Sequence, residues 1–522
     1  MRWQSITKIL VVSSALGAEI AHALLATNTP LLGLGFSSGA FICTLFIARR
    51  FPLHAMAAVM LGLYILPAVY FLLFHHFAFF HSLPVSACLL AIFLARPSLR
   101  QWQLPQQWQL PLVFWAVLIA LSWPIIFMRE LDFTFALPPS APLLTGATVS
   151  NFSAIPPHIA ALWIAHAALR HSIGILLLDW LFCTFQTKHR TDFMQWVLLP
   201  LAIGVFVNIF VAFYQSFIDN GFLTASWMDI SRASGTVIDA NALGVLAALW
   251  GPALVVLFMR RQASNSVPLA LFTLAGSWLC MLLSGSTSAL WIAGPTAGVL
   301  LWFGGKALFS TLSPNRILLS LISLGFACGL VWISFASPMN RSLSRLWGNL
   351  PLSSEASLST VLESQLRDRP FFARIAIQIA TERSFAGIGV GRFHTLGHKY
   401  ALQMVASDPR AASAGEIYNC GVNCCAHNWY LEQVAELGLL GILAWVLWII
   451  VFIRTVLLVS PEGSLSLSVS LLKSILVGFG LASVFNIPAE NLAILLTFWI
   501  FIFWLSSYFP HLAVPREKIP TG

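Results

Sequence analysis

The residues best suited to acid–base chemistry lie in the segment from His427 to Glu432, which runs through Glu436 into an apolar stretch. A histidine titrates near neutral pH and can accept a proton from a hydroxyl group. At a junction between a loop and a membrane helix, His427 could meet both an aqueous and a lipid-bound reactant. Asn428, Glu432 and Glu436 are its supporting candidates, although ideal helical spacing puts both glutamates on a different face from His427. The alternative is an interfacial belt of His, Trp and Tyr.

A second group of residues could bind an anion such as a diphosphate. It contains three arginines, Arg367, Arg369 and Arg374. Arginine binds diphosphate oxygens in bidentate fashion. The stretch from Gly387 to Arg392 follows, and a turn containing Gly389 and Gly391 would let backbone N–H groups approach phosphate. These glycines do not form a nucleotide-binding fingerprint, because no strand–turn–helix unit surrounds them. A solvated charge run with a plain turn is the alternative.

Arg232 is a third candidate, because it precedes Ser234-Gly235-Thr236 and leads through Asp239 and Asn241 into an apolar segment. An arginine at the membrane surface beside a helix N-terminus could bind an anion, since unpaired N–H groups there carry partial positive charge. The alternative is an interfacial arginine whose charged end extends toward water.

The elements that must position these residues are membrane helices. Of 522 residues, 58% are hydrophobic and 9% are charged, whereas an ordinary soluble domain is roughly one quarter charged. This composition excludes a water-soluble globule and a disordered chain. The net charge of +9 indicates basic cytoplasmic loops rather than a nucleic-acid partner. Eight cysteines do not make a disulfide framework, but Cys420, Cys424 and Cys425 share one polar stretch and could include a disulfide after export.

Apolar runs predict an all-α, polytopic bundle of about fourteen transmembrane helices. The predicted helices cover residues 6–26, 31–48, 53–74, 77–95, 111–128, 158–183, 194–217, 239–259, 267–283, 286–303, 317–337, 435–457, 465–485 and 491–507. We divide the chain into residues 1–337 with helices 1–11, a long loop over 338–434, and residues 435–522 with helices 12–14 and a tail. Periodicity over 361–384 predicts that the loop is partly helical.

The charges of the short loops orient this bundle. With the N-terminus inside, the inside segments carry Arg2, Lys8, Arg49, Arg50, Arg96, Arg100, Lys188, Arg190, Arg260, Arg261, Lys306, Arg316, Arg454, Arg516 and Lys518. The short outside loops carry only Arg129 and Arg232. Basic residues concentrate in cytoplasmic loops, so both termini are predicted to be cytoplasmic and the long loop to be outside.

Ionisable residues also fall inside the predicted spans, at Glu19, Arg170, Asp179 and Lys473. Charge is costly in a bilayer, so each is a functional hypothesis. Arg170 and Asp179 lie on opposite sides of an ideal helix and must therefore find other partners.

The order of these motifs resembles the O-antigen ligase and polymerase superfamily. The resemblance rests on Arg232 with Gly235-Thr236 and Asn241, on Arg374 with the glycine motif from Ala386 to Phe393, and on His427-Asn428-x-x-Leu431-Glu432 with Glu436-x-Gly438. It covers residues from about 200 to 445, and the segment starting at His427 is its most specific part.

The resemblance implies a membrane-integrated glycosyltransferase of the C-type class. Such an enzyme moves a glycan from undecaprenyl diphosphate to an acceptor sugar, either lipid A core or a growing glycan, on the periplasmic face of the bacterial inner membrane. It implies inversion at the anomeric carbon, without metal or cofactor. His427 would be the base, Arg232 and Arg374 would bind the diphosphate, and Asn428, Glu432, Glu436, Gly389 and Gly391 would support them.

Two other functions stay open at this point. A protein O-oligosaccharyltransferase of the same superfamily differs only in its acceptor, which one sequence does not reveal. A transporter or flippase of lipid-linked sugars is the alternative from another class, and it predicts internal repeats and helices broken near the midplane. The polar residues gather outside rather than at mid-bilayer, which favours the enzyme.

Overall fold

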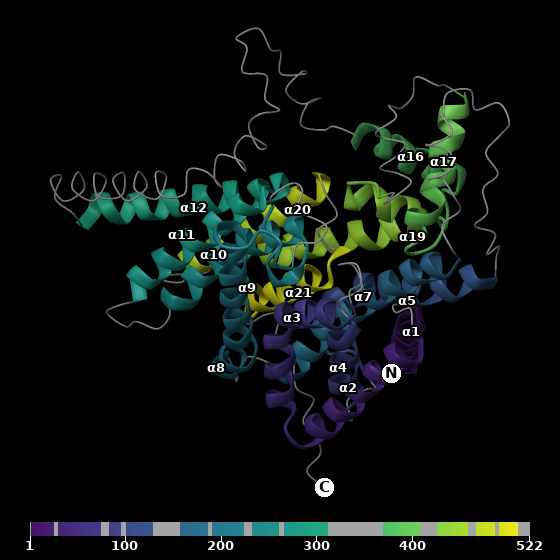
Figure 1. The fold of residues 1–522 in the computed structure, drawn as a ribbon, viewed down its shortest axis with the longest axis horizontal. Coiled ribbons are helices and arrows are strands. Elements are labelled where there is room, and N and C mark those ends of the chain that lie inside the picture. The colour runs from purple at the N-terminus through teal and green to yellow at the C-terminus, as the bar shows by residue number, and fades with distance from the viewer. Residues whose placement is uncertain are drawn as a thin grey trace.

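The computed structural model describes residues 2–25, 30–74, 83–95, 101–128, 157–185, 190–223, 232–259, 266–311, 369–407, 425–457, 466–485 and 490–509. Within these ranges the chain is helical and contains no strand (Figure 1). Continuous apolar runs explain this, because in a bilayer a helix satisfies its own backbone hydrogen bonds whereas an open sheet edge does not.

The long helices are α1 (Arg2–Leu25), α2 (Pro30–Arg50), α3 (Pro52–Phe74), α4 (Leu83–Leu94), α5 (Gln106–Met128), α7 (Pro157–Thr184), α9 (Leu199–Phe217), α10 (Ala240–Met259), α11 (Ser266–Ser284), α12 (Thr287–Thr311), α16 (Arg369–Glu382), α17 (Phe393–Ser407), α19 (Trp429–Phe452), α20 (Ser466–Phe485) and α21 (Leu492–Ser506). Each predicted span coincides with one of them except 317–337, which lies outside the described residues.

Eight of the described helices are long and apolar enough to cross a membrane. They are α1, α2, α3, α7, α9 with its preceding π-helical turn, α10, α19 and α20. Shorter apolar helices occupy Pro84–Leu94, Ala270–Ser284, Thr287–Phe303 and Leu492–Ser506. The polytopic helical class is therefore confirmed by length and composition, and the count of fourteen stays a prediction.

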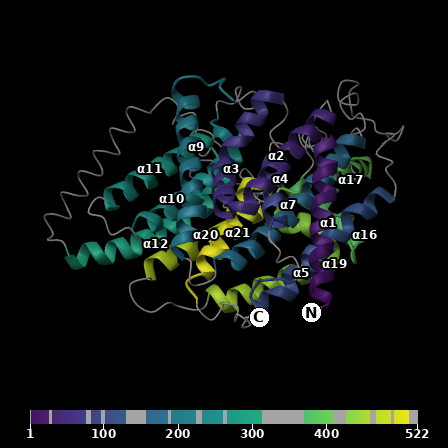
Figure 2. The ribbon, with the colours of Figure 1, turned by 90° about the horizontal axis from the view of Figure 1, so that it is seen from below.

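α7 and α21 form the centre of the bundle. Every residue of α21 is buried, and Figure 2 shows it surrounded by α7, α10 and α20. Gly174 of α7 permits this packing, because a Cβ atom at this position would overlap the indole of Trp499 on α21. Charged side chains carried by α7 are consequently enclosed by protein on all sides.

α16 and α17 form a separate small unit on top of α19, at the upper right of Figure 1. Their apolar faces make a hydrophobic cluster that includes Phe371, Phe372, Ile375, Phe393 and Ala435. The helix predicted within 361–384 is confirmed over Arg369–Glu382. The remainder of the long loop, at 338–368 and 408–424, lies outside the described residues.

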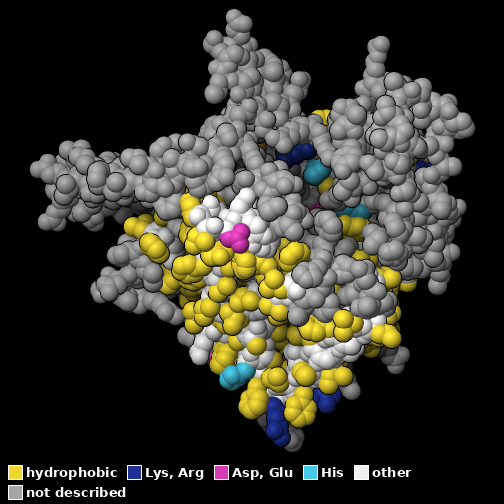
Figure 3. Space-filling model, in the orientation of Figure 1, with side chains coloured by type: hydrophobic (Ala, Val, Ile, Leu, Met, Phe, Trp, Pro, Cys, Tyr) yellow, Lys and Arg dark blue, Asp and Glu magenta, His cyan; other side chains and the backbone are white. Residues whose placement is uncertain are grey.

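The described surface has an apolar band and a basic tip. Figure 3 shows hydrophobic side chains over most of the described lower half, with Lys and Arg at its lowest point. Phe46, Phe210 and Leu301 are among the large apolar side chains that face outward. Arg49 and Arg50 are exposed where α2 ends. An apolar exterior of this kind suits a lipid environment.

Candidate active site

Asn428 starts α19 and thereby fixes the position of His427. Asn428 has an extended backbone, and its side-chain oxygen accepts a hydrogen bond from Leu431 N at 3.0 Å, as a helix N-cap does. The helix consequently begins at Trp429, whereas the sequence predicted a span from 435. His427 is the residue before the cap and lies at the positive end of the helix dipole.

His427 is half-buried and has a left-handed backbone conformation, with φ of 47°. Its ring contacts Phe372 of α16 at 5.0 Å between ring centres. Its Nε2 lies 3.5 Å from the Cys425 Sγ. Non-glycine residues adopt this conformation at a cost, and it occurs most often where surrounding contacts impose it. The unit formed by α16 and α19 therefore fixes the imidazole.

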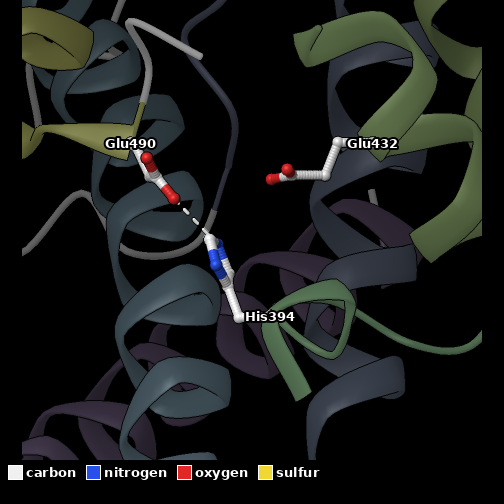
Figure 4. A group of neighbouring side chains, drawn as sticks. All are labelled: His394, Glu432 and Glu490. Atoms are coloured by element: carbon white, nitrogen blue, oxygen red, sulfur yellow. Dashed lines mark ion pairs between the residues drawn. The ribbon is translucent and has the colours of Figure 1, made fainter. Parts of the chain in front are cut away.

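A buried group of ionisable residues lies beside this loop. It consists of His394 at the start of α17, Glu432 in the first turn of α19, and Glu490 just before α21 (Figure 4). His394 Nε2 and Glu490 Oε1 form an ion pair at 2.8 Å. The Glu432 carboxylate points toward both from the opposite side. The His394 ring also stacks on Trp163 of α7, at 4.2 Å between ring centres.

The ion pair changes the titration of both partners. Burial would lower the pKa of His394, but the charges of Glu490, Glu432 and Glu436 outweigh burial and raise this pKa to about 9. Burial would raise the pKa of Glu490, and the nearby His394 and Arg170 charges instead hold it below its ordinary value. Without other ligands, His394 is thus a cation at neutral pH and a poor base.

Glu432 links the buried group to the loop that carries His427. Its Oε2 accepts a hydrogen bond from Ala426 N at 3.2 Å, one residue before His427. Arg170 of α7 is 2% exposed and interacts electrostatically with Glu432, Glu436 and Glu490. Arg170 therefore has the acidic neighbours that its position on α7 required, and they come from two distant parts of the chain, α19 and the segment before α21.

The glycine-rich stretch binds an internal carboxylate. Gly389 N donates to the Glu436 carbonyl oxygen at 2.7 Å. Gly391 N and Phe393 N both donate to the Glu436 side chain. The N–H groups that the sequence suggested for phosphate are thus engaged by Glu436. Gly389 and Gly391 have φ of 99° and 71°, which is why glycine occupies both positions.

Gly438 breaks α19 at this same contact. Its φ of 59° and ψ of −156° are non-helical. The backbone groups freed by the break bond to the chain after α16, with Leu439 N donating to Ser384 O at 2.8 Å and Ile388 N donating to Ala435 O at 3.0 Å. The glycine stretch and the first turns of α19 therefore form one rigid unit.

Arg232 is fixed at the entrance to α10. Its Nε donates to the Ser284 carbonyl oxygen at 2.6 Å, and its Nη2 donates to Asn241 Oδ1 at 2.7 Å. Asp239 interacts electrostatically with both Arg232 and Glu490. Glu490 in turn interacts electrostatically with His427. Two of the predicted site residues, Arg232 and His427, are thus linked electrostatically through Asp239 and Glu490.

Arg374 is exposed on α16, and its guanidinium lies 6.0 Å from the centre of the Phe371 ring. Arg369 is five residues earlier, which turns it by about 140° on an ideal helix, and its charge acts on Cys425 beside His427. The charge of Arg369 therefore reaches the His427 loop. Arg367 lies outside the described residues.

Cys425 is a free, buried thiol. Burial raises the pKa of Cys425 well above its ordinary value, and the Glu490 and Glu432 charges add to this. The thiol is consequently protonated at neutral pH and can donate to His427 Nε2. The predicted disulfide therefore does not include Cys425, and a bond between Cys420 and Cys424 lies outside the described residues.

The sequence did not identify His394 or Glu490 as site residues. They are 96 positions apart in the numbering, and no motif joins them, because only the folding of α17 and α21 against α7 makes them neighbours. One signal was present in the sequence, namely an isolated acid at the start of an apolar run. His394, Glu432 and Glu490 could hold a metal ion, since one ligand atom from each lies within 4.8 Å of the others.

The whole arrangement offers a fixed, half-buried imidazole that interacts electrostatically with a group of acidic residues. It can accept a proton at His427 and stabilise an anion at Arg232. A scan against protein-family models and a search of curated proteins each found no match to this sequence.

Proposed function

We propose that this protein transfers a glycan from undecaprenyl diphosphate to an acceptor sugar at the outer face of the bacterial inner membrane. The acceptor hydroxyl oxygen attacks the anomeric carbon while the bond from that carbon to the diphosphate breaks. The proton of the hydroxyl passes to His427, and undecaprenyl diphosphate departs. Attack from the face opposite the leaving group inverts the anomeric centre, and arginines rather than a metal stabilise the departing charge.

The fixed position of His427 is the observation that carries this proposal. The imidazole is half-buried, held by Phe372 and Cys425, and lies at the N-terminus of a helix that is apolar enough to enter the membrane. A base in this position can reach an acceptor from water and a donor from lipid. His394 is unsuited to the role, because its pairing with Glu490 keeps it protonated.

Arg232 and Arg374 are the proposed diphosphate ligands, and Arg369 joins them. Arg232 has its Nε and Nη2 engaged by the protein, which fixes the guanidinium in space. A preorganised charge stabilises an anion without the cost of ordering a mobile side chain. Arg369 supports the same role through its closeness to Cys425.

The test of His427 is a transfer assay with purified lipid-linked glycan. His427→Ala is expected to abolish transfer while donor binding persists. His427→Gln keeps some hydrogen bonding but cannot take the proton, and is expected to be nearly as inactive. His54→Gln is the control, because His54 is an exposed histidine at the start of α3. Turnover of His427→Gln equal to that of the unchanged protein would remove the general-base role.

The arginines are compared in the same assay. Arg232→Ala is expected to lose about 1.5–3 kcal/mol of transition-state stabilisation, the usual contribution of a hydrogen bond to a charged group, or roughly 10- to 150-fold in kcat/KM. Arg232→Lys should rescue only partly, because a point charge does not reproduce the guanidinium fork. The kcat/KM values of Arg369→Ala and Arg374→Ala show which arginine of α16 contributes more to transfer. Arg50→Ala is the control. Equal kcat/KM in all four alanine variants would refute diphosphate binding by these arginines.

The acceptor is decided by product analysis. Lipid A core, a growing glycan and a protein hydroxyl are attacking groups of the same kind, so His427 could serve all three reactions. Supplying each acceptor separately and identifying the glycosylated product distinguishes a ligase, a polymerase and a protein O-oligosaccharyltransferase.

One observation favours the transporter alternative. α19 is broken at Gly438, and broken helices are typical of transporter binding sites. Glu432, Glu436 and Arg170 are also buried within candidate spans. A fluorescent lipid-linked sugar in proteoliposomes tests this function. Movement across the bilayer that persists in His427→Gln, without glycan transfer by the unchanged protein, would favour a flippase.

A further inference from the structure

His394, Glu432 and Glu490 form a donor set that the proposed transfer reaction does not use. One imidazole nitrogen and two carboxylate oxygens lie within 4.8 Å of one another. His394 and Glu432 are 4% and 1% exposed. The three residues come from α17, α19 and the segment before α21, so any ion bound between them would join three separate elements.

We propose that His394, Glu432 and Glu490 bind one divalent transition-metal ion, with Zn²⁺ and Mn²⁺ as the ions of this ligand chemistry. Imidazole nitrogen and carboxylate oxygen are ligands that both ions accept. The site goes beyond the transfer reaction and does not depend on it.

The side chains around this donor set are mostly acidic. Three carboxyl groups, of Glu432, Glu436 and Glu490, lie in the same region as the guanidinium of Arg170. Isolated charge is costly in a buried site. A divalent cation supplies positive charge to these carboxyl groups, which must be deprotonated to act as ligands.

The geometry needs only small side-chain movements. Ligand bonds to Zn²⁺ are about 2.0–2.2 Å long, so two ligand atoms of one ion lie at most about 4.4 Å apart. The three ligand atoms already lie within 4.8 Å of one another. Figure 4 shows the Glu432 carboxylate aimed at Glu490 across a short gap. Two carboxylates that face one another repel unless one of them is protonated or a cation lies between them.

The His394–Glu490 ion pair is the metal-free form of this site. In that form His394 Nε2 and Glu490 Oε1 lie 2.8 Å apart as an ion pair, with the proton on the imidazole. An entering ion takes the nitrogen lone pair, and the proton leaves to solvent. Metal binding to a protonated imidazole releases a proton in this way. No oxidation or reduction accompanies the exchange.

The bound ion would fix the position of the loop that carries His427. Glu432 is both a proposed ligand and the acceptor of the Ala426 N hydrogen bond. Fixing Glu432 therefore fixes the residue before His427. The ion does not contact the reacting sugar in this arrangement, and its role is positional.

Metal binding to the full-length protein in detergent tests the proposal. After treatment with EDTA and removal of the chelator, Zn²⁺ is titrated by calorimetry and Mn²⁺ by electron paramagnetic resonance. We expect one ion per chain, release of about one proton at neutral pH, and a higher thermal midpoint with Zn²⁺. His394→Gln and Glu490→Gln should each weaken binding by at least about tenfold. Glu19→Gln is the control, since it removes another buried carboxylate, on α1.

X-ray absorption at the zinc edge keeps the test decisive if a variant fails to fold. In the unchanged protein we expect one imidazole nitrogen and carboxylate oxygens around the ion. An absence of stoichiometric binding would overturn the proposal and leave a proton-sharing ion-pair network. Unchanged affinity in the two ligand variants, or a coordination shell without imidazole, would also overturn it. If the unchanged protein binds the metal ion but transfers no glycan, this result would count against the proposed function alone.

Discussion

At the scale of single residues, the charges buried in the apolar helices have partners. Lys8 and Asp179 form an ion pair, Glu19 accepts hydrogen bonds from Ser37 and Ser86, and Lys473 donates to a backbone carbonyl oxygen. Arg170 faces three carboxylates. Such pairing is what a medium of low polarity requires. Among the described residues, three carboxyl groups thus gather around Arg170, and one of them, Glu432, also bonds to the loop that carries His427.

Gly438→Ala is predicted to destabilise the protein strongly. A Cβ atom at Gly438 would lie 2.7 Å from the Phe385 carbonyl oxygen, and its backbone conformation is one that side chains rarely adopt. The conformational strain alone costs about 1–3 kcal/mol. Thermal unfolding in detergent, followed by tryptophan fluorescence, measures the change.

Gly276→Ala is the matched control. Gly276 lies within helix α11, and a Cβ atom there meets nothing within 4 Å. Alanine in a helix interior is favoured over glycine by about 0.5–1 kcal/mol, so this variant should unfold at an equal or higher temperature. Equal stability of both variants would show that the break at Gly438 is not required.

The sequence could predict one side of the site and not the other. His427, Asn428 and Glu432 share a short segment whose capping residue is visible in the sequence. His394 and Glu490 could not be found, because their pairing depends on how α17 and α21 pack against α7. The phosphate role suggested for Gly389 and Gly391 also depended on tertiary structure, since Glu436 takes up the N–H groups around them.

At the scale of elements, α19 shows why a boundary was mispredicted. The predicted span started at 435 because Glu432 and Gln433 are polar, whereas the helix starts at Trp429. Both side chains are buried against protein rather than lipid. Hydropathy alone does not distinguish these two environments. The helix predicted within 361–384 was confirmed, because its periodicity reports one apolar face directly.

Lys8 and Asp179 hold α1 against α7. Their ion pair is 2.6 Å long and almost completely buried, and Lys8 Nζ also donates to the Gln101 carbonyl oxygen at 2.8 Å. Lys8→Met is predicted to cost about 3–5 kcal/mol, because it leaves the Asp179 carboxylate without its counter-charge. The double variant Lys8→Met with Asp179→Asn should recover much of this loss. The free energy of unfolding of each variant measures the coupling.

Lys399→Met is the control for this pair. Lys399 is exposed on α17, and surface substitutions usually change stability by less than about 0.5 kcal/mol. A double variant no more stable than Lys8→Met would mean that the lysine contributes through packing instead of charge.

At the scale of the whole molecule, the described helices separate a basic end from the candidate active site. Arg49 and Arg50 lie at the end of α2, in the lower part of Figure 1, and α16 and α17 lie at the top. The loop charges predict that the basic end is cytoplasmic. We therefore expect Arg50→Cys and Gln403→Cys to react with a membrane-impermeant thiol reagent from opposite sides. Gln403 is exposed on α17.

The labelling is done in intact cells and in inverted vesicles, with all native cysteines replaced. Both cysteines labelled from the same side would contradict the predicted orientation. Helical class followed from composition alone, and hydropathy located the described helices, eight of which are long and apolar enough to cross a membrane. The electrostatic link from Arg232 through Asp239 and Glu490 to His427 did not, because it depends on tertiary packing rather than on loop order.

The left-handed backbone at His427 sets two selection pressures against each other. Glycine would adopt φ of 47° without the strain of about 1 kcal/mol that a side chain bears there. Variants of residue 427 chosen only for survival on heating should therefore drift toward glycine, whereas variants chosen for turnover should keep histidine. If the first selection also retains histidine, the ring contributes more through Phe372 and Cys425 than its backbone costs.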